Sequence, residues 1–406
     1  MRYLSRLVST EKGVLSFRRG RSASIRGGLM LPSVSGPARA KSVDNSYRGK
    51  VAIVQTLDRI CIPLKPDRGV QVFHEGREEL FFKSAGSLVP GDKIVKRFPA
   101  TLEFSGIDRV SEDQALFLGL MIADGTYTGK AAGYNTNTGR IAVGCHDFSS
   151  LDIVEALMRR VFSGERMSFK WSDNYDKKGR VYAKQMWIPA HVMDKYAPKL
   201  GLKKAAALEK SIPSTILTSS PSIQRTFLTA LFAGDGCYKH DQAKVYYSTS
   251  SRQLMLDVVS LLTHLGYRPT VNVGMNKPLR GKETFSDGLT EHELFKISIT
   301  SVFANAFVDE VGCFYPRKSQ AYHHHSGPLY GGIPYRLRGW GKVGSFEKGP
   351  KGRRQRRRLW EENSIILSPV KSVEIVDSSP EVVPFPAFGV LHGSPILSNG
   401  FALTPS

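Results

Sequence analysis

The chain has 406 residues and a net charge of +21, because 57 lysines and arginines oppose 36 aspartates and glutamates. Charge this lopsided predicts a polyanionic partner: DNA, RNA or an anionic membrane surface. No apolar run approaches the ~20 residues that cross a bilayer, which excludes a membrane-spanning protein. The four cysteines lie far apart without a CxxC pair, which argues against a disulfide framework or a four-cysteine zinc site and favours a reducing, intracellular compartment.

The first 43 residues are set apart by their composition. They hold seven arginines, many serines and a single acid, Glu11. An Arg- and Ser-rich, acid-poor start is typical of a mitochondrial presequence. A basic tail that contacts nucleic acid and a remnant of an older domain are the alternatives. The expected location is at DNA, in the mitochondrion in the first case and in the nucleus or nucleoid in the others.

Short strand patterns with turn signals fill 44–98 and return in 363–406. The region between these two segments divides in two. Residues 111–313 alternate helical and strand patterns and are expected to form the compact centre. Residues 314–362 are rich in Gly, Tyr, His, Pro and Arg without a sustained period, which predicts an irregular basic linker.

The centre contains a repeated motif. Residues 117–125 read Phe-Leu-Gly-Leu-Met-Ile-Ala-Asp-Gly, and residues 228–236 read Leu-Thr-Ala-Leu-Phe-Ala-Gly-Asp-Gly. The offset of 111 residues that carries Asp124 onto Asp235 also carries Gly201 onto Gly312. The repeat therefore spans whole units, which we place at 111–221 and 222–313.

Each unit follows the same order of expected elements: a helix ending in Asp-Gly, two strands, a helix, two strands and a closing helix. In the first unit Ser111 and Gln114 form a capping box, a hairpin spans 129–146 and a helix spans 149–162. In the second, the hairpin spans 237–250 and the helix 252–265. The pattern predicts an α+β fold with a pseudo-twofold duplicated αββαββα core.

The position of the two aspartates indicates a metal site. An Asp in the last turn of a helix faces the negative end of the helix dipole, which is unfavourable without a cation. Small residues would let the two motif helices pack closely and bring Asp124 and Asp235 together; these are Gly119, Ala123, Ala230 and Gly234. Adjacent carboxylates repel unless a metal neutralises them, and Mg²⁺ is the expected occupant. Such a site is suited to phosphodiester hydrolysis.

The two motifs resemble those of single-chain LAGLIDADG homing endonucleases, over roughly 111–312. The resemblance implies that Asp124 and Asp235 are metal-binding catalytic acids holding two or three divalent ions at the ends of the motif helices. Both motifs depart from the consensus at the sixth position, where Ile122 and Ala233 replace Asp. That position is not the metal ligand, so the departure leaves the site intact.

The resemblance also implies a Lys or Gln from the last strands of each unit near the scissile phosphates. Lys296 matches well, and the 111-residue offset maps it onto Gln185, with Lys184 beside it. A solvated strand lysine is the alternative for Lys296. The implied partner is double-stranded DNA with a long asymmetric target. The resemblance implies that the protein binds it as a monomer and does not associate with a membrane.

Side chains on the strands and hairpin tips are the candidates for contacting DNA, some through phosphates and some through bases. They are Lys130, Tyr134, Asn135, Asn137, Arg140, Lys170, Lys239, Lys244, Tyr246, Lys277, Arg280 and Lys282.

The flanks 44–98 and 363–406 resemble the two halves of a mostly-β Hint (intein) domain that the endonuclease interrupts. Inteins carry Thr-x-x-His, where this chain has Lys65-Pro-Asp-Arg68. They end in His-Asn before a nucleophile, where this chain has Thr-Pro405-Ser. Asn cyclisation is impossible with proline in that place, so the resemblance implies that protein splicing is lost.

The sequence therefore predicts a Mg²⁺-dependent, site-specific double-strand DNA endonuclease derived from an intein. The alternative is a catalytically idle nucleic-acid-binding protein, such as an intron RNA maturase or a ribosome-associated component, with RNA as its partner. Retention of both aspartates and Lys296 favours the enzyme.

Overall fold

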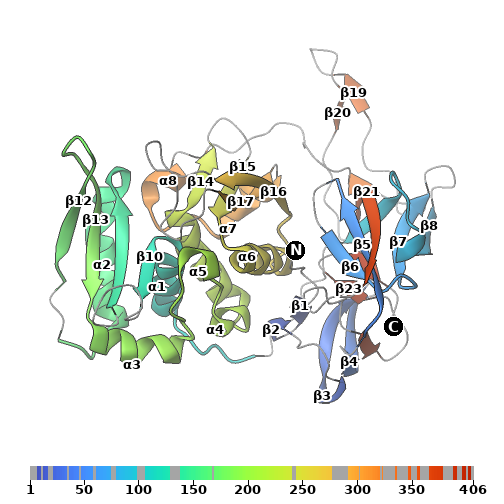
Figure 1. Ribbon diagram of the computed structural model, residues 1–406, viewed down its shortest axis with the longest axis horizontal. Helices are drawn as coiled ribbons and strands as arrows, with labels where there is room; N and C mark the ends of the chain where they lie inside the picture. Colours follow the sequence, from blue (N-terminus) through green and yellow to red (C-terminus); the bar gives the residue numbers. More distant parts are fainter. Residues whose placement is uncertain are drawn as a thin grey trace.

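The computed structural model shows two neighbouring parts, a central part of helices and two small sheets and a flanking part made of strands (Figure 1). It describes residues 7–10, 12–16, 22–33, 36–44, 47–57, 61–74, 79–97, 106–128, 138–166, 169–239, 244–276, 291–300, 302–320, 322, 334–335, 346–348, 354–356, 365–377, 387–390, 396–398 and 401–403.

The first unit of the central part begins with helix α1 (Glu112–Ala123), whose start carries the expected capping box between Ser111 and Gln114. The chain continues through β10 (Gly125–Thr128), β11 (Thr138–Gly144), the 3₁₀ turns η4 (Cys145–Ser150), α2 (Leu151–Val161), β12 (Trp171–Tyr175), β13 (Val181–Ile188) and α3 (Ala190–Leu200). The strands form an antiparallel sheet in the order β10-β11-β13-β12.

A connection with η5 (Ala207–Glu209) and α4 (Ser214–Leu217) leads to the second unit. Its elements are α5 (Pro221–Gly234), β14 (Gly236–Lys239), β15 (Lys244–Thr249), α6 (Arg252–His264), β16 (Pro269–Asn276), β17 (His292–Thr300) and α7 (Val302–Glu310). The sheet order is β14-β15-β17-β16, which has the same pattern as the first sheet. The mixed helices and antiparallel sheets agree with the predicted α+β class.

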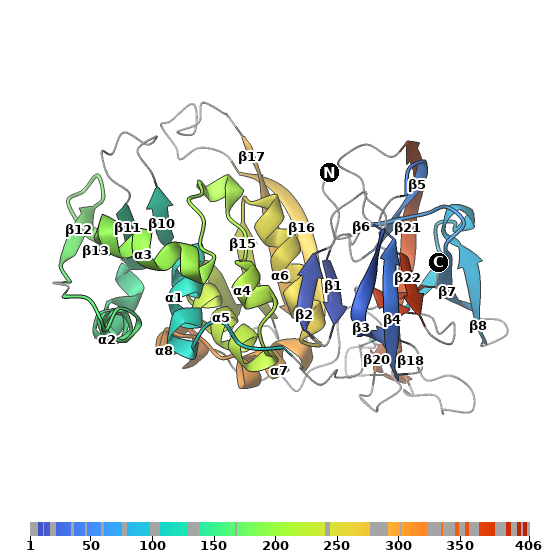
Figure 2. The same ribbon diagram turned by 90° about the horizontal axis from the view of Figure 1, so that it is seen from below.

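Helices α1 and α5 pack side by side at the centre of the two units (Figures 1 and 2). Most of their side chains are buried, including Phe117, Leu120, Phe227 and Leu231. A helix that is apolar on nearly every side requires burial on every side. The two sheets and the outer helices provide that cover, and the C-terminal ends of both helices point to the same region.

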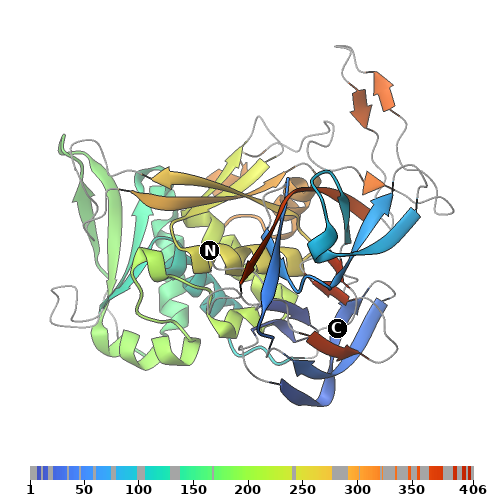
Figure 3. The same cartoon turned by 45° about the vertical axis from the view of Figure 1, so that its right-hand side comes forward.

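Strands from both ends of the chain form a single 12-stranded antiparallel sheet (Figure 3). Strand β21 (Ile365–Asp377) pairs with β5 (Lys50–Thr56) and with β9 (Lys93–Arg97). The other members are β3 (Ser22–Ser33), β4 (Gly36–Asp44), β6 (Cys61–Leu64), β7 (Gly69–His74), β8 (Glu79–Ser84), β18 (Pro334–Tyr335), β22 (Ala387–Val390), β23 (Ile396–Ser398) and β24 (Phe401–Leu403). The flanks therefore share one hydrogen-bonded framework around the inserted centre.

The structure differs from the sequence-based boundaries in two places. Residues 1–43 were expected to form a separate extension, but β3 and β4 pair with β23 and β22 in the flanking sheet, and β1 (Leu7–Thr10) with β2 (Gly13–Ser16) lies beside α6. The expected irregular linker contains helix α8 (Pro316–Gln320) and a hairpin of β19 (Phe346–Lys348) and β20 (Arg354–Arg356). The pairing partners of β3 and β4 are β23 and β22, which lie far along the chain, so composition alone does not reveal this pairing.

The stretch Lys65-Pro-Asp-Arg68, which we match to the Thr-x-x-His of inteins, carries a cationic side chain at each end. The Lys65 ammonium lies 4.9 Å from the centre of the Tyr47 ring. Arg68 is only 4% exposed, and burial lowers the pKa of its guanidinium to about 10. Neither side chain has the hydroxyl or imidazole that Thr and His would supply.

Candidate metal and nucleic-acid site

Asp124 and Asp235 are the C-cap residues of α1 and α5, and the two helices bring them together. The helices approach so closely that a Cβ added to Gly119 would lie 2.5 Å from the carbonyl oxygen of Phe227. A Cβ on Gly234 would lie 2.5 Å from Oδ2 of Asp124. The carboxylate of Asp124 thus touches the backbone one residue before Asp235. The predicted close contact of the motif helices is confirmed.

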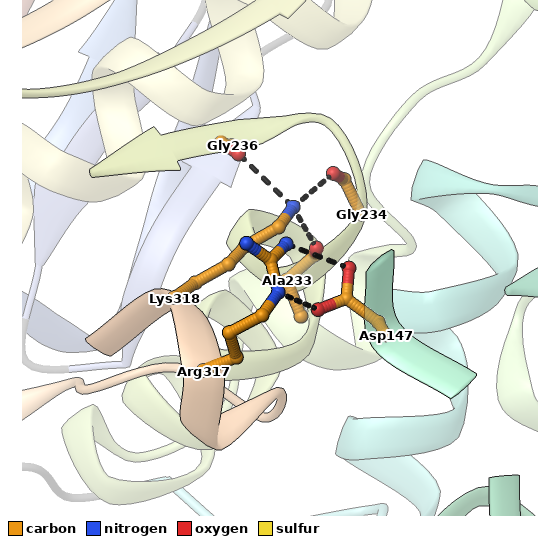
Figure 4. Close-up of polar contacts among 6 residues, drawn as sticks. All are labelled: Asp147, Ala233, Gly234, Gly236, Arg317 and Lys318. Carbon is orange, nitrogen blue, oxygen red and sulfur yellow. Dashed lines mark hydrogen bonds and ion pairs between the residues drawn. The ribbon is translucent and has the colours of Figure 1, made fainter. Parts of the chain in front are cut away.

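A lysine ammonium caps each of these helix ends. Nζ of Lys210 donates to the carbonyl oxygens of Ala123 (2.8 Å) and Gly125 (3.1 Å). Nζ of Lys318, from α8, donates to those of Gly234 (2.7 Å) and Gly236 (3.1 Å), and also to that of Ala233 (Figure 4). The carbonyls of Ala123 and Gly125 map onto those of Gly234 and Gly236 by the offset of 111. The last carbonyls of a helix lack intrahelical partners and face the negative end of its dipole, so a cation is favoured there.

The electrostatics of the two acids are dominated by loss of hydration. Solvent reaches Asp235 at the rim of the site, but the surrounding protein atoms displace enough water to raise the pKa of its carboxyl to about 7, helped by the charge of Asp124. Burial also raises the pKa of Asp124, against the opposing charges of Lys318 and Lys210. The same environment lowers the pKa of Lys210, although both carboxylates oppose that shift. Burial therefore disfavours the charged form of the two aspartates and also that of Lys210.

An ion pair between the buried Asp147 and the exposed Arg317 lies next to this centre. The Arg317 guanidinium donates from Nε (3.0 Å) and Nη2 (3.3 Å) to the two carboxylate oxygens of Asp147, which is 6% exposed and belongs to η4 of the first unit (Figure 4). The negative charge of Asp147 acts on Asp124 and raises its pKa. Arg317 thus neutralises a third carboxylate at the edge of the site.

The residues at the helix ends fit a hard divalent cation. The two carboxylates supply oxygen ligands, the type that Mg²⁺ prefers. The hydroxyls of Tyr247 and Tyr315 are buried without a hydrogen-bond partner, and both side chains lie within electrostatic reach of Asp124. Within the described residues no three His, Cys, Asp or Glu side chains gather as a metal site. Two carboxylates therefore leave coordination positions for water and phosphate oxygens.

Stabilisation of the protein by Mg²⁺ is expected to increase between pH 6 and pH 8. Metal must compete with a proton at Asp235, whose pKa is about 7, so affinity rises as this carboxyl ionises. The measurement is the shift in melting temperature on adding Mg²⁺ at each pH. In Asp235→Asn the increase with pH is expected to disappear; an equal increase in that variant would contradict the assignment.

The open face of the second sheet is basic. Val245, Tyr247, Ile297 and Ile299 turn toward the helices and are buried. The alternating residues of the same strands therefore share the opposite face. They include Lys244, Tyr246, Ser248 and Lys296, and Lys239 pairs directly with Lys244. The Lys296 ammonium lies 3.6 Å from the centre of the Tyr246 ring, and Lys296 and Lys239 add to burial in lowering the pKa of Lys244.

The first sheet separates two residues that the sequence grouped. Gln185 accepts a hydrogen bond from Arg140 (3.4 Å), and Arg140 lies 5.7 Å from the ring of Trp187, so these three share the open face. Lys184 alternates to the other face: it forms an ion pair with Asp173 (2.7 Å) and lies over Phe148 of η4. Lys184 and Gln185 therefore lie on opposite faces of this sheet.

Two lysines whose charges act on the acids come from outside the strands. Lys296, Lys184 and Gln185 make the strand contacts described above, whereas Lys210 and Lys318 are the lysines whose charges act on Asp124 and Asp235. Sequence reasoning did not assign them this role. One signal was available: each lysine precedes a serine, and the two Lys-Ser pairs lie 108 residues apart, close to the repeat offset.

Of the remaining candidates for DNA contact, Lys170 is exposed just before β12. The others lie outside the described residues: Lys130, Tyr134, Asn135, Asn137, Lys277, Arg280 and Lys282. No helix among the described residues has the length and apolar character needed to cross a membrane.

Comparison with known proteins supports the resemblance of the second unit. Residues 222–301 match the family model of the LAGLIDADG-like domain. The chain is 28% identical over 196 residues to the replicative DNA helicase DnaB of Rhodothermus marinus, covering 46% of this chain and 19% of the helicase. It is 27% identical over 199 residues to the DNA gyrase A protein of Mycobacterium malmoense, covering 47% and 38%. The chain thus spans well under half the length of these relatives.

Among solved structures, the chain is similar to the homing endonuclease I-WcaI bound to its DNA recognition sequence. The TM-score is 0.32 and the identity 13%, with coverage of 53% of this chain and 88% of that chain.

Proposed function

We propose that the chain is a site-specific, Mg²⁺-dependent endonuclease of the homing type that hydrolyses phosphodiester bonds in double-stranded DNA. The observation that carries the proposal is the pairing of Asp124 and Asp235 at the ends of two closely packed helices, with Lys210 and Lys318 at the same ends. The match of residues 222–301 to the LAGLIDADG-like domain supports it.

In this proposal Asp124 and Asp235 would hold the divalent ions, two or three in number. When bound there, Mg²⁺ would supply Lewis-acid chemistry that activates water and stabilises the leaving oxygen. Lys210 and Lys318 keep positive charge beside the reacting phosphates, where it opposes the negative charge that develops during the reaction.

The open faces of the two sheets are proposed as the DNA-binding surface. Lysines 239, 244 and 296 suit contacts to phosphates, and the Arg140–Gln185 pair presents donors and acceptors suited to base edges. Because the two sheets carry different side chains, one monomer would recognise a long asymmetric target.

The flanking sheet is proposed to be a Hint-like domain that has lost protein splicing. Arg68 is a buried cation where a splicing domain needs histidine, and Lys65 replaces its threonine. A guanidinium remains protonated at neutral pH and is not a general base. The flanks then act as a scaffold for the inserted endonuclease.

The test is cleavage of a highly diverse pool of duplex DNA by the purified protein in Mg²⁺, with the cut ends sequenced. Recurrent double-strand breaks within one sequence motif are expected, and EDTA should abolish them. Binding of duplex without any cut, or tighter binding of structured RNA than of duplex, would overturn the proposal in favour of a nucleic-acid-binding protein.

Replacing Lys244 with Gln is expected to weaken duplex binding and to lower the slope of log Kd against log salt by about one, as for loss of one phosphate contact. Lys244 lies on the open face between Lys239 and Lys296. Fluorescence anisotropy over a salt series measures the effect. Lys371→Gln, an exposed lysine of the flanking strand β21, serves as the control and should leave the slope unchanged.

A further inference from the structure

The lysine at the Asp235 end is held in place by the first unit. Lys318 belongs to α8, a helix of only five residues. Such a short helix has little stability of its own, so its position depends on tertiary contacts. The neighbouring Arg317 supplies one by its two hydrogen bonds to the buried Asp147, in η4 of the first unit (Figure 4). An arginine that binds a carboxylate through two donors fixes orientation as well as distance.

The lysine at the Asp124 end is held by the second unit. Lys210 lies in the connection between the units, outside any helix or strand. Ser251, the N-cap of α6, donates from Oγ to the carbonyl oxygen of Lys210 (2.6 Å). Asp257 in the same helix accepts from the backbone N–H of Ile212 (2.9 Å) and is 2% exposed. Both contacts come from the unit that does not contain Asp124.

We propose that each unit positions the lysine that caps the end of the other unit's motif helix. Asp147 and Arg317 position Lys318 at the end of α5, and Ser251 and Asp257 position Lys210 at the end of α1. These are positioning residues, because they act through a lysine. For its effect on cleavage the inference rests on the proposed function. It implies that the two lysines are positioned by different residues and can be displaced independently.

The arrangement has a consequence that general loss of stability does not share. Because the two lysines lie at the ends of different helices, each is expected to act mainly on the reacting phosphate of one DNA strand. Loosening Lys318 and loosening Lys210 should therefore slow opposite strands, and a nicked intermediate should accumulate in each case. Small misplacements of a catalytic group cost up to about 10²-fold in rate.

The experiment compares Arg317→Gln with Ser251→Asp in single-turnover cleavage of a target labelled on both strands. Aspartate retains the acceptor that caps α6 but lacks the donor to Lys210, so cap loss is separated from positioning. Each variant is expected to slow one strand by ten- to a hundredfold, with opposite strand preference and unchanged Kd. Ser251→Thr, which keeps the hydroxyl, should restore the wild-type ratio. Equal slowing of both strands, or the same strand in both variants, would overturn the inference.

A second measurement does not depend on cleavage. In protein labelled with ¹⁵N at lysine Nζ, hydrogen exchange of the Lys318 and Lys210 ammonium groups reports how firmly each is bound. Arg317→Gln should speed exchange at Lys318 alone, and Ser251→Asp at Lys210 alone. If the wild-type protein cuts no duplex, the proposed function fails while this result still decides the positioning; unchanged exchange in both variants would refute it.

Discussion

Replacing either Asp124 or Asp235 with Asn is expected to abolish duplex cleavage, with a loss of at least about 10³-fold in single-turnover rate. The amide keeps the shape of the side chain but removes the charge that holds the divalent ions, which contribute several kcal/mol to stabilising the transition state. Because the aspartates lie at the ends of packed helices rather than on the open sheet faces, duplex affinity should change little. Cleavage and anisotropy measurements on one duplex separate the two effects.

The same substitution is expected to make the metal-free protein more stable at pH 8. The pKa of Asp235 is about 7 in the fold, above its usual value, so its ionised form is disfavoured by folding. Stability associated with this group is therefore fully present at acidic pH and is lost as pH rises through 7. Asp235→Asn removes that loss, so its melting temperature should exceed the wild type's at pH 8 and approach it at pH 5.

Asp377→Asn provides the matched control, since Asp377 is an exposed acid at the end of the flanking strand β21. It should leave cleavage and the pH dependence of melting unchanged. If Asp235→Asn cleaved DNA at the wild-type rate, or melted earlier than wild type at pH 8 without metal, the assignment of a destabilised metal-binding carboxylate would be wrong.

The aspartate pair was predictable because its determinants are local. Each motif contains its own small residues, apolar faces and terminal Asp-Gly. The repeat of the motif therefore predicts two such helices. Strand alternation likewise places Lys296 and Tyr246 on one face of the second sheet. The motif does not contain the lysine that binds the carbonyls at the end of each helix. Lys210 comes from an irregular connection and Lys318 from a five-residue helix, and neither has a periodic signal.

The flanking sheet shows the same limit on a larger scale. Strand patterns within 44–98 and 363–406 were visible separately, but the pairing of β5 with β21 joins residues more than 300 positions apart. Alternating hydrophobicity predicts that a strand exists and which face it buries. It does not predict which other strand pairs with it. Residues 22–43 were assigned to an extension because their arginines and serines resemble a presequence, although half of a sheet's residues face solvent and tolerate such side chains.

Gly119→Ala is expected to destabilise the protein by about 2 kcal/mol or more and to reduce cleavage as well. The new Cβ would lie 2.5 Å from the carbonyl oxygen of Phe227 and 2.7 Å from Cβ of Ala230, so the backbones of α1 and α5 must separate. Helix propensity alone would favour alanine over glycine by about 1 kcal/mol, so the sign of the effect distinguishes the two explanations.

The control is Gly144→Ala, since Gly144 is exposed at the end of β11 and a Cβ there meets no atom within 4 Å. Its φ of −69° suits any residue, so this change should be neutral or slightly stabilising. Denaturant unfolding of both variants gives the comparison. A stability gain in Gly119→Ala would mean that α1 and α5 do not touch at this position; then nothing would hold Asp124 against Asp235, and the shared metal site would lose its structural basis.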